Sequence, residues 1–342
     1  MFMRLLIPVL ILLFSVSVTA SNGFRQFNIG DSTRPVRVAV WYPTDARLAS
    51  ERVADNPAFE GVNVIRNAEP SAGQHPLLLL SHGYGGNWRN QAWLADAMAA
   101  QGYIVIAPDH PGTTTQDMTA AHAQQLWQRP QDLKASLDMI TANPALAGHI
   151  DLNRIAAVGH SLGGWTVMEL AGARFDTQQF LRDCLHHAEL SSCRLTQKLG
   201  IQHALTAAPL AANLRDERIK AFVTLDLGLS RGLTAHSLKQ VTSPVLVLTA
   251  GEDSPALPAR LESHYLADRL ESDVVTYKVV SGATHFSFMQ LCKPQGEALI
   301  EQNAPGEGEI CHDGAGVSRR ALHKKLANDI SRFLNTALHY QP

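Results

Sequence analysis

Short apolar runs that alternate with helix-like stretches constrain the fold more than any other feature of the chain. The runs cover residues 36–42, 77–80, 103–107, 154–158, 221–225, 245–249 and 274–280. Most are continuous in Val, Ile and Leu, which is typical of parallel strands buried on both faces. Apolar residues at helical spacing fall in residues 88–101, 130–141, 162–171, 258–270 and 317–338. The alternation predicts one α/β domain with a mostly parallel central sheet flanked by helices.

The stretch from about 175 to 218 interrupts this rhythm. It is polar and helix-like, and it contains two cysteines. An insertion at this point is expected above the carboxyl ends of the strands, where open α/β sheets bind ligands. We interpret it as an inserted helical cap that acts as a lid or a specificity element. The alternative is a surface insertion without a role in binding.

The first twenty residues have the layout of a secretory signal peptide. A short basic start, Met1 to Arg4, precedes the apolar run Leu5 to Val18, and small residues follow before Ser21. The apolar run is shorter than the roughly 20 residues of a spanning helix, which argues against a membrane anchor. We therefore predict a signal peptide at 1–20, a single α/β domain at 21–342 with the insertion at about 175–218, and a secreted or periplasmic protein without stable membrane insertion.

The number of cysteines, four, is consistent with an exported protein. In an exported chain an even number favours disulfides, although Cys184, Cys193, Cys292 and Cys311 allow three connectivities. Pairing of sequence neighbours, Cys184 with Cys193 and Cys292 with Cys311, is the simplest prediction. None of the four stands in a metal-ligand spacing, so no metal site is predicted.

The charge balance excludes one class of partner. The 342 residues carry 29 Lys and Arg against 31 Asp and Glu, a formal net charge of −2, and no run of like charges. A nucleic-acid-binding protein normally carries a basic patch, so no nucleic-acid partner is expected.

The strongest motif is GHSLGG at residues 159–164, between a predicted strand and a predicted helix. A serine on such a tight turn holds its hydroxyl free above the sheet, and the glycines remove side chains that would clash there. The N-terminus of the following helix points its free N–H groups at a developing oxyanion. The context predicts that Ser161 is a nucleophile.

A serine nucleophile needs a base, and position selects one histidine from the fifteen in the chain. His285 lies in a loop directly after the last predicted strand, from which it can reach a serine on a central strand. A second glycine-containing loop, SHGYGG at residues 81–86, follows the strand expected beside the nucleophile strand. We predict that the backbone N–H groups of Tyr84 and Leu162 form the oxyanion hole, and that His82 is structural.

At these motifs the chain resembles the α/β-hydrolase superfamily, and within it the bacterial relatives of platelet-activating-factor acetylhydrolase that are often labelled dienelactone-hydrolase-like. The resemblance rests on VAVWYP at 38–43, SHGYG at 81–85, PDH at 108–110, RPQD at 129–132, GHSLGG at 159–164, GATHFSF at 282–288 and the nearby Cys292. It implies the α/β-hydrolase fold, Ser161 as nucleophile, His285 as base and a carboxylate that orients the base. True dienelactone hydrolases have a cysteine nucleophile, so that particular activity is not expected.

Two aspartates compete for the role of the triad acid. Most α/β hydrolases place the acid after the strand that here ends at Thr249, usually three residues past a glycine, but Ser254 occupies that position and Asp253 lies one residue early. The acetylhydrolase branch takes its acid from a Leu-Asp pair at the end of the preceding strand, which Leu225-Asp226 matches. The resemblance favours Asp226, with Asp253 as the alternative.

Together these features predict an exported serine esterase that needs no cofactor. The expected substrates are small-molecule or lipid-derived esters, with short-chain or acetyl esters implied by the resemblance alone. An acyltransferase or a peptidase could use the same triad, and a non-catalytic binding protein on this fold is a further alternative. The sequence leaves the oligomeric state open. Asp109 and His110, at a strand end, either line the pocket or cap a turn.

Overall fold

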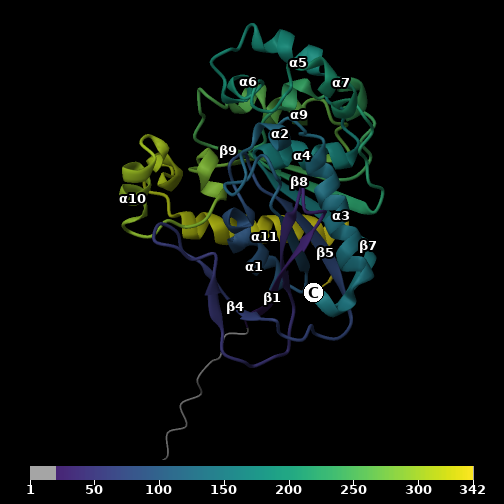
Figure 1. Cartoon of the computed structure of the whole chain (residues 1–342), viewed down its shortest axis with the longest axis vertical. Coiled ribbons are helices and arrows are strands. Elements are labelled where there is room, and N and C mark those ends of the chain that lie inside the picture. The colour runs from purple at the N-terminus through teal and green to yellow at the C-terminus, as the bar shows by residue number, and fades with distance from the viewer. Residues whose placement is uncertain (1–20, 342) are drawn as a thin grey trace, which may run out of the picture.

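The computed structural model describes residues 21–341 of the chain (Figure 1). The predicted signal peptide at 1–20 lies outside the described residues. The strands are β1 (Asn22–Ile29), β2 (Val36–Tyr42), β3 (Glu51–Val53), β4 (Val62–Arg66), β5 (Gln74–Ser81), β6 (Ile104–Pro108), β7 (His149–His160), β8 (Ile219–Leu225), β9 (Val245–Ala250) and β10 (Val275–Val280).

The α-helices lie mostly between these strands. They are α1 (Ala92–Ala99), α2 (Ala120–Ala123), α3 (Gln128–Ala142), α4 (Leu162–Ala171), α5 (Thr177–Cys184), α6 (Ser191–Arg194), α7 (Ala204–Leu210), α8 (Ala235–Leu238), α9 (Ser263–Ala267), α10 (Gly296–Asn303) and α11 (Arg319–Ala337). Short 3₁₀ helices join several of them, of which η5 (His285–Phe288) matters for the site.

The ten strands found within residues 21–341 form one sheet, in the order β10-β9-β8-β7-β5-β6-β2-β1-β4-β3. Every neighbouring pair from β10 to β6 is parallel, whereas β2 is antiparallel to both β6 and β1. The predicted mostly parallel α/β sheet is therefore confirmed. The sequence analysis missed β1, β3 and β4, which are short or lack a continuous Val, Ile and Leu run.

Helices cover both faces of the sheet, which explains why the central strands are apolar throughout. Along β5, Leu77 and Leu79 pack into the core shared with α3 and α4. Their neighbours Leu78 and Leu80 point the other way, into the core shared with α1 and α11. Successive side chains of a strand face opposite sides of the sheet. In a strand covered on both faces every side chain is therefore buried, which favours apolar residues at every position.

The predicted cap segment, residues 175–218, contains α5, α6 and α7, and it joins α4 to β8. In Figure 1 these helices gather at the upper end of the molecule, next to α9. A buried arginine ties them to the body: Arg231 forms an ion pair with Asp183 (Nε–Oδ2 2.7 Å) and donates to Ser192 Oγ at 3.0 Å. Ser192 in turn donates to the buried Glu262 at 3.0 Å. These bonds attach the cap at a fixed position on the body.

Within residues 21–341, the structure has no helix that combines the length and the apolar character needed to cross a membrane.

Candidate active site

Ser161 occupies the sharp turn between β7 and α4. Its backbone has φ 55° and ψ −120°, a left-handed conformation that a residue with a Cβ rarely adopts. Neighbouring glycines make the turn possible, because a Cβ on Gly163 would lie 2.0 Å from the carbonyl oxygen of Ser81, and one on Gly159 would lie 2.0 Å from that of Gly163. The strain holds the serine side chain up at the end of the strand.

We expect Gly163→Ala to lower the free energy of unfolding by about 1–3 kcal/mol, because the added methyl group must displace the backbone of β5 at Ser81. Urea unfolding checks this. Gly228→Ala is the matched control, since its Cβ meets only Leu257 Cδ1, at 3.5 Å. Equal stability of the two variants would show that the turn is not packed as described.

His285 joins two residues that are far apart in the sequence. It begins η5, in the loop after β10, and its Nε2 lies 3.1 Å from Ser161 Oγ. On its other side, Nδ1 lies 2.7 Å from Oδ2 of Asp226. With Asp226 ionised, Nδ1–H donates to the carboxylate and Nε2 is free to accept the serine proton. The structure thus brings Ser161, His285 and Asp226 together as a continuous hydrogen-bonded chain.

Asp226 is held as a buried carboxylate directly after β8, with φ 47°. Its Oδ1 accepts from the backbone N–H of Ala250 at 2.9 Å and from Thr249 Oγ at 3.0 Å. Burial by itself raises the pKa of Asp226, but these bonds and the contact with His285 outweigh it and lower the pKa below the usual value. The side chain therefore stays ionised and keeps its orienting bond to the base.

The structure does not bring the alternative acid, Asp253, to the base. Its side chain is exposed and accepts from the backbone N–H of Ala259 at 2.9 Å, where it caps a loop turn. The Leu-Asp pair at the end of β8, and not the loop after β9, supplies the carboxylate that bonds to His285.

The loop and the helix that carry the predicted oxyanion groups both adjoin Ser161. Gly83 lies against it, since a Cβ on Gly83 would be 3.1 Å from Ser161 Cβ, and Tyr84 follows in the same loop. The loop is fixed on its far side because Gly85 N donates to Thr113 O at 2.9 Å. Leu162 begins α4, so its N–H is among those left free at a helix N-terminus.

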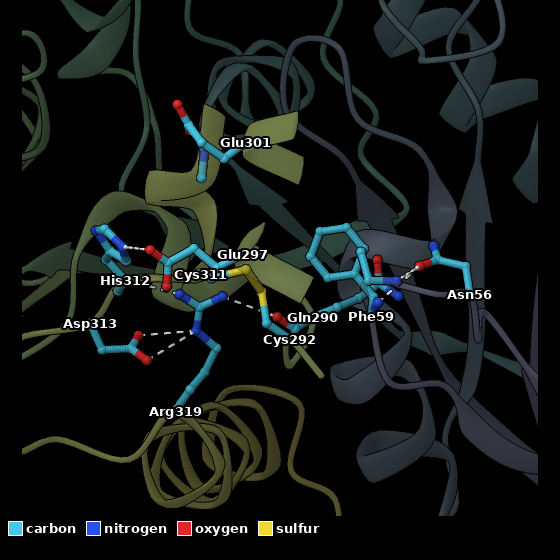
Figure 2. The surroundings of a disulfide bond; sticks show 12 residues. Asn56, Phe59, Gln290, Cys292, Glu297, Glu301, Cys311, His312, Asp313 and Arg319 are labelled. Atoms are coloured by element: carbon cyan, nitrogen blue, oxygen red, sulfur yellow. Dashed lines mark hydrogen bonds and ion pairs between the residues drawn. A yellow bond between two sulfur atoms is a disulfide. The ribbon is translucent and has the colours of Figure 1, made fainter. Parts of the chain in front are cut away.

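The loop that carries the base has supports that the sequence analysis did not identify. Ser287 Oγ accepts from the backbone N–H of Thr284 at 2.8 Å and donates to Asp313. Arg319 binds Asp313 (Nε–Oδ1 3.0 Å) and also donates to the backbone oxygens of Gln290 and His312 at 3.0 Å. Figure 2 shows the bonds of Arg319 beside the Cys292–Cys311 disulfide. No spacing signal pointed to Asp313 and Arg319, because both lie more than twenty residues after His285.

The structure joins Cys184 to Cys193 within the cap, and Cys292 to Cys311 after the base loop. The second bond closes the loop 292–311, which ends two residues before Asp313, the acceptor of the Ser287 hydroxyl (the disulfide and Asp313 are seen in Figure 2). Both bonds therefore lie outside the sheet, one in the cap segment and one in the segment after the base loop.

We expect removal of the Cys292–Cys311 bond, as the double serine variant, to lower the free energy of unfolding by about 3 kcal/mol, since the reduced chain regains loop entropy when unfolded. Thermal unfolding with and without a reductant measures the loss. A reductant should lower the melting temperature of the wild-type chain and change that of a variant without any cysteine by much less. Equal shifts would argue against a stabilising disulfide.

His160, next to the nucleophile, is a further residue whose role the sequence did not reveal. Its Nε2–H donates to the backbone oxygen of His285 at 2.9 Å, and this bond helps to hold the backbone of His285 in place. Burial and the neighbouring His285 lower the pKa of His160, which keeps the ring neutral.

A second Ser-His-Asp set lies nearby, made of Ser81, His110 and Asp132. Neither Ser81 nor His110 has any solvent-exposed surface, so no substrate carbonyl can reach this serine. Ser161, by contrast, is partly exposed. Geometry alone would fit either set, and access favours Ser161 as the reacting one.

In the described part of the chain, one group of side chains has metal-ligand proximity: Asp183, Cys184 and Cys193. The two sulfurs are bonded to each other, so they are unavailable as thiolate ligands.

Comparisons with known proteins bear on the fold. Residues 73–182 match the family model described as serine aminopeptidase, S33. A ferulic acid esterase from Streptomyces cinnamoneus aligns over 95% of this chain and 92% of its own, with a TM-score of 0.65 and 18% identity. The chain has the α/β-hydrolase fold. A puromycin-hydrolysing peptidase from Mycobacterium tuberculosis aligns over 97% of this chain and 42% of its own, with a TM-score of 0.53 and 16% identity.

Curated relatives match over shorter segments. Cutinase est2 of Thermobifida alba is 39% identical over 101 residues, which is 29% of this chain and 31% of that protein. A bis(hydroxyethyl) terephthalate hydrolase of Streptomyces coelicolor is 29% identical over 116 residues, 34% of each chain. The chain thus spans about a third of the length of these relatives.

Proposed function

We propose that this protein is an exported serine hydrolase that cleaves carboxylic esters. The observation that carries the proposal is the position of His285, which is bonded to Asp226 on one side and to Ser161 on the other. This is the arrangement that activates a serine hydroxyl at neutral pH.

The residues account for both halves of the reaction. Ser161 Oγ attacks the ester carbonyl while His285 Nε2 takes its proton, and the N–H groups of Tyr84 and Leu162 stabilise the oxyanion of the tetrahedral intermediate. The intermediate collapses to the acyl-enzyme as His285 protonates the departing alcohol. Water then attacks the acyl group as it gives a proton to His285. When this second tetrahedral intermediate collapses, His285 returns the proton to Ser161 Oγ and the acid is released. Every group used belongs to this chain, so the mechanism requires no cofactor.

The relatives favour esters over amides. The cutinases, the terephthalate ester hydrolase and the ferulic acid esterase support an ester substrate. The resemblance to acetylhydrolases favours short-chain or acetyl esters, including lipid-derived ones, with the cap helices limiting chain length. The second candidate is a peptidase, which the matching family model and the puromycin-hydrolysing neighbour favour.

Export is part of the proposal. Two disulfides among the described residues are typical of an oxidising compartment, and the leader-like residues 1–20 support cleavage before Ser21. Mass spectrometry of the protein recovered outside the cytoplasm tests this, and a mature N-terminus at Ser21 is the expected result.

Hydrolysis of p-nitrophenyl esters from acetate to longer acyl chains, by the chain from residue 21, tests the activity. We expect turnover to be highest for short chains and a fluorophosphonate probe to label Ser161. A parallel series of p-nitroanilides separates the esterase from the peptidase. No turnover of any ester, together with an unlabelled Ser161, would contradict the proposal.

A further inference from the structure

A buried polar cluster lies beneath the candidate oxyanion hole and takes no part in the mechanism above. It contains Arg34, Ser81, His82, His110, Arg129 and Asp132. The motifs at 108–110 and 129–132 supply three of these residues. Of the two roles considered for Asp109 and His110, lining a pocket is not what the structure has: Asp109 accepts from the backbone N–H of Trp88 at 2.7 Å, and His110 is fully buried.

The hydrogen bonds of this cluster determine which of its atoms carry the protons. His110 Nδ1–H donates to Asp132 at 3.0 Å, so Nε2 accepts from the hydroxyl of Ser81, also at 3.0 Å. Burial, with Arg129 and Arg34 nearby, holds the pKa of His110 well below its usual value and keeps the ring neutral. Ser81 Oγ then accepts from Arg129 Nη2 at 3.2 Å. The hydroxyl of Ser81 is thus fully engaged inside the protein.

Arg129, on α3, contacts both halves of the candidate oxyanion hole. Its Nη2 donates to the backbone oxygen of His82, two residues before Tyr84. Its Nε donates to Thr166 Oγ at 2.9 Å, and Thr166 donates to the backbone oxygen of Leu162 at 3.0 Å. One guanidinium group therefore binds the loop that carries one N–H donor and the helix turn that carries the other.

A third bond of Arg129 holds the far end of the oxyanion loop. Nη1 donates to Thr113 Oγ at 2.5 Å, and the backbone oxygen of Thr113 accepts from Gly85 N at 2.9 Å. Tyr84 thus lies between two points, His82 and Gly85, that are both fixed through this arginine. Arg129 itself is 1% exposed, so it does not meet the substrate.

We propose that Arg129 is a positioning residue that sets the spacing between the backbone N–H groups of Tyr84 and Leu162. The inference rests on the proposed function, since those groups matter only if an oxyanion forms at Ser161. Hydrogen bonds to an oxyanion depend steeply on donor position, and a misplacement of about 1 Å can cost roughly 10²-fold in rate.

Arg129→Lys tests the inference, because lysine keeps the buried charge but cannot make all these bonds at once. We expect kcat per fluorophosphonate-labelled serine to fall by about 10²-fold, with KM within about threefold of wild type. Inhibition by an alkyl boronic acid, whose tetrahedral adduct occupies the oxyanion hole, should weaken by a factor similar to the loss of kcat/KM.

Arg34→Gln is the matched control. Its guanidinium binds Asp132 at the other end of the cluster, with Nη2–Oδ2 at 3.0 Å, and not the loop. We expect a lower melting temperature with kcat per labelled serine and boronate inhibition unchanged. If Arg129→Lys behaves like this control, the arginine only stabilises the fold and the inference is overturned.

Thr166→Val keeps the shape of the side chain and removes one link, so it serves if Arg129→Lys does not fold. We expect a fall of several-fold in kcat. Where Arg129→Lys does fold, combining the two substitutions should add no further loss, because both act through one path. A kcat equal to that of wild type would refute the link to Leu162. Wild-type esterase activity is measured first, so failure of the proposed function is distinguished from failure of the positioning role.

Discussion

Replacing Ser161 with alanine is expected to lower kcat by about 10⁶-fold and to abolish labelling by a fluorophosphonate. In the proposed mechanism this hydroxyl forms the acyl-enzyme, and its oxygen lies 3.1 Å from His285 Nε2. The fold should survive, because alanine at the turn removes one partly exposed oxygen. Ester turnover and probe labelling measure the loss, and thermal unfolding confirms the fold.

Ser81→Ala separates the two serine-histidine pairs. Ser81 bonds to His110 at 3.0 Å but is fully buried. We expect this variant to lose stability and to keep probe labelling at Ser161. Loss of labelling in Ser81→Ala with labelling retained in Ser161→Ala would reverse the assignment of the nucleophile.

Replacing Asp226 with asparagine is expected to lower kcat by about 10⁴-fold. An amide at this position can present its NH₂ group to Nδ1 of His285, which stabilises the tautomer that carries its proton on Nε2 and so cannot accept from Ser161. The bonds that the side chain at 226 accepts from Ala250 N and Thr249 Oγ can persist in the variant and hold that side chain in place. We therefore expect the tautomer of His285 to change while its position changes little.

Asp253→Asn is the control for the acid. It makes the same Asp-to-Asn change at the alternative aspartate, which does not contact His285. Its exposed carboxylate caps a turn at Ala259, so we expect turnover within about twofold of wild type and little change in stability. Steady-state kinetics of both variants decide between the two aspartates. A large loss in Asp253→Asn with full activity in Asp226→Asn would contradict the assignment made here.

The strands of the sheet could be predicted from the sequence where helices pack against both faces. Leu77 to Leu80 face alternate cores, and this produces the continuous apolar run that predicts a buried parallel strand. β1 could not be read in this way. It contains Arg25 and Gln26 among its residues, and only Phe24 and a few neighbours are buried, so no clear period appears.

The candidate site could be predicted where one short motif carries the geometry. Ser161 is fixed by local glycines, and His285 by its place after the last strand. Asp226 was favoured only through the resemblance, because nothing local distinguishes it from Asp253. The supports of these residues, such as Arg319 and Arg129, act across long sequence separations, and a single sequence holds no signal for such contacts.

The order of the sheet has a consequence for synthesis of the chain. Ser161 and the oxyanion loop directly follow β7 and β5, which leave the ribosome well before β10 and the base loop. Arg319, which holds that loop through Asp313, emerges later still. Throughout most of translation Ser161 therefore has no histidine beside it, and the proposed ester cleavage can begin only when the last part of the chain folds back onto the strands made first.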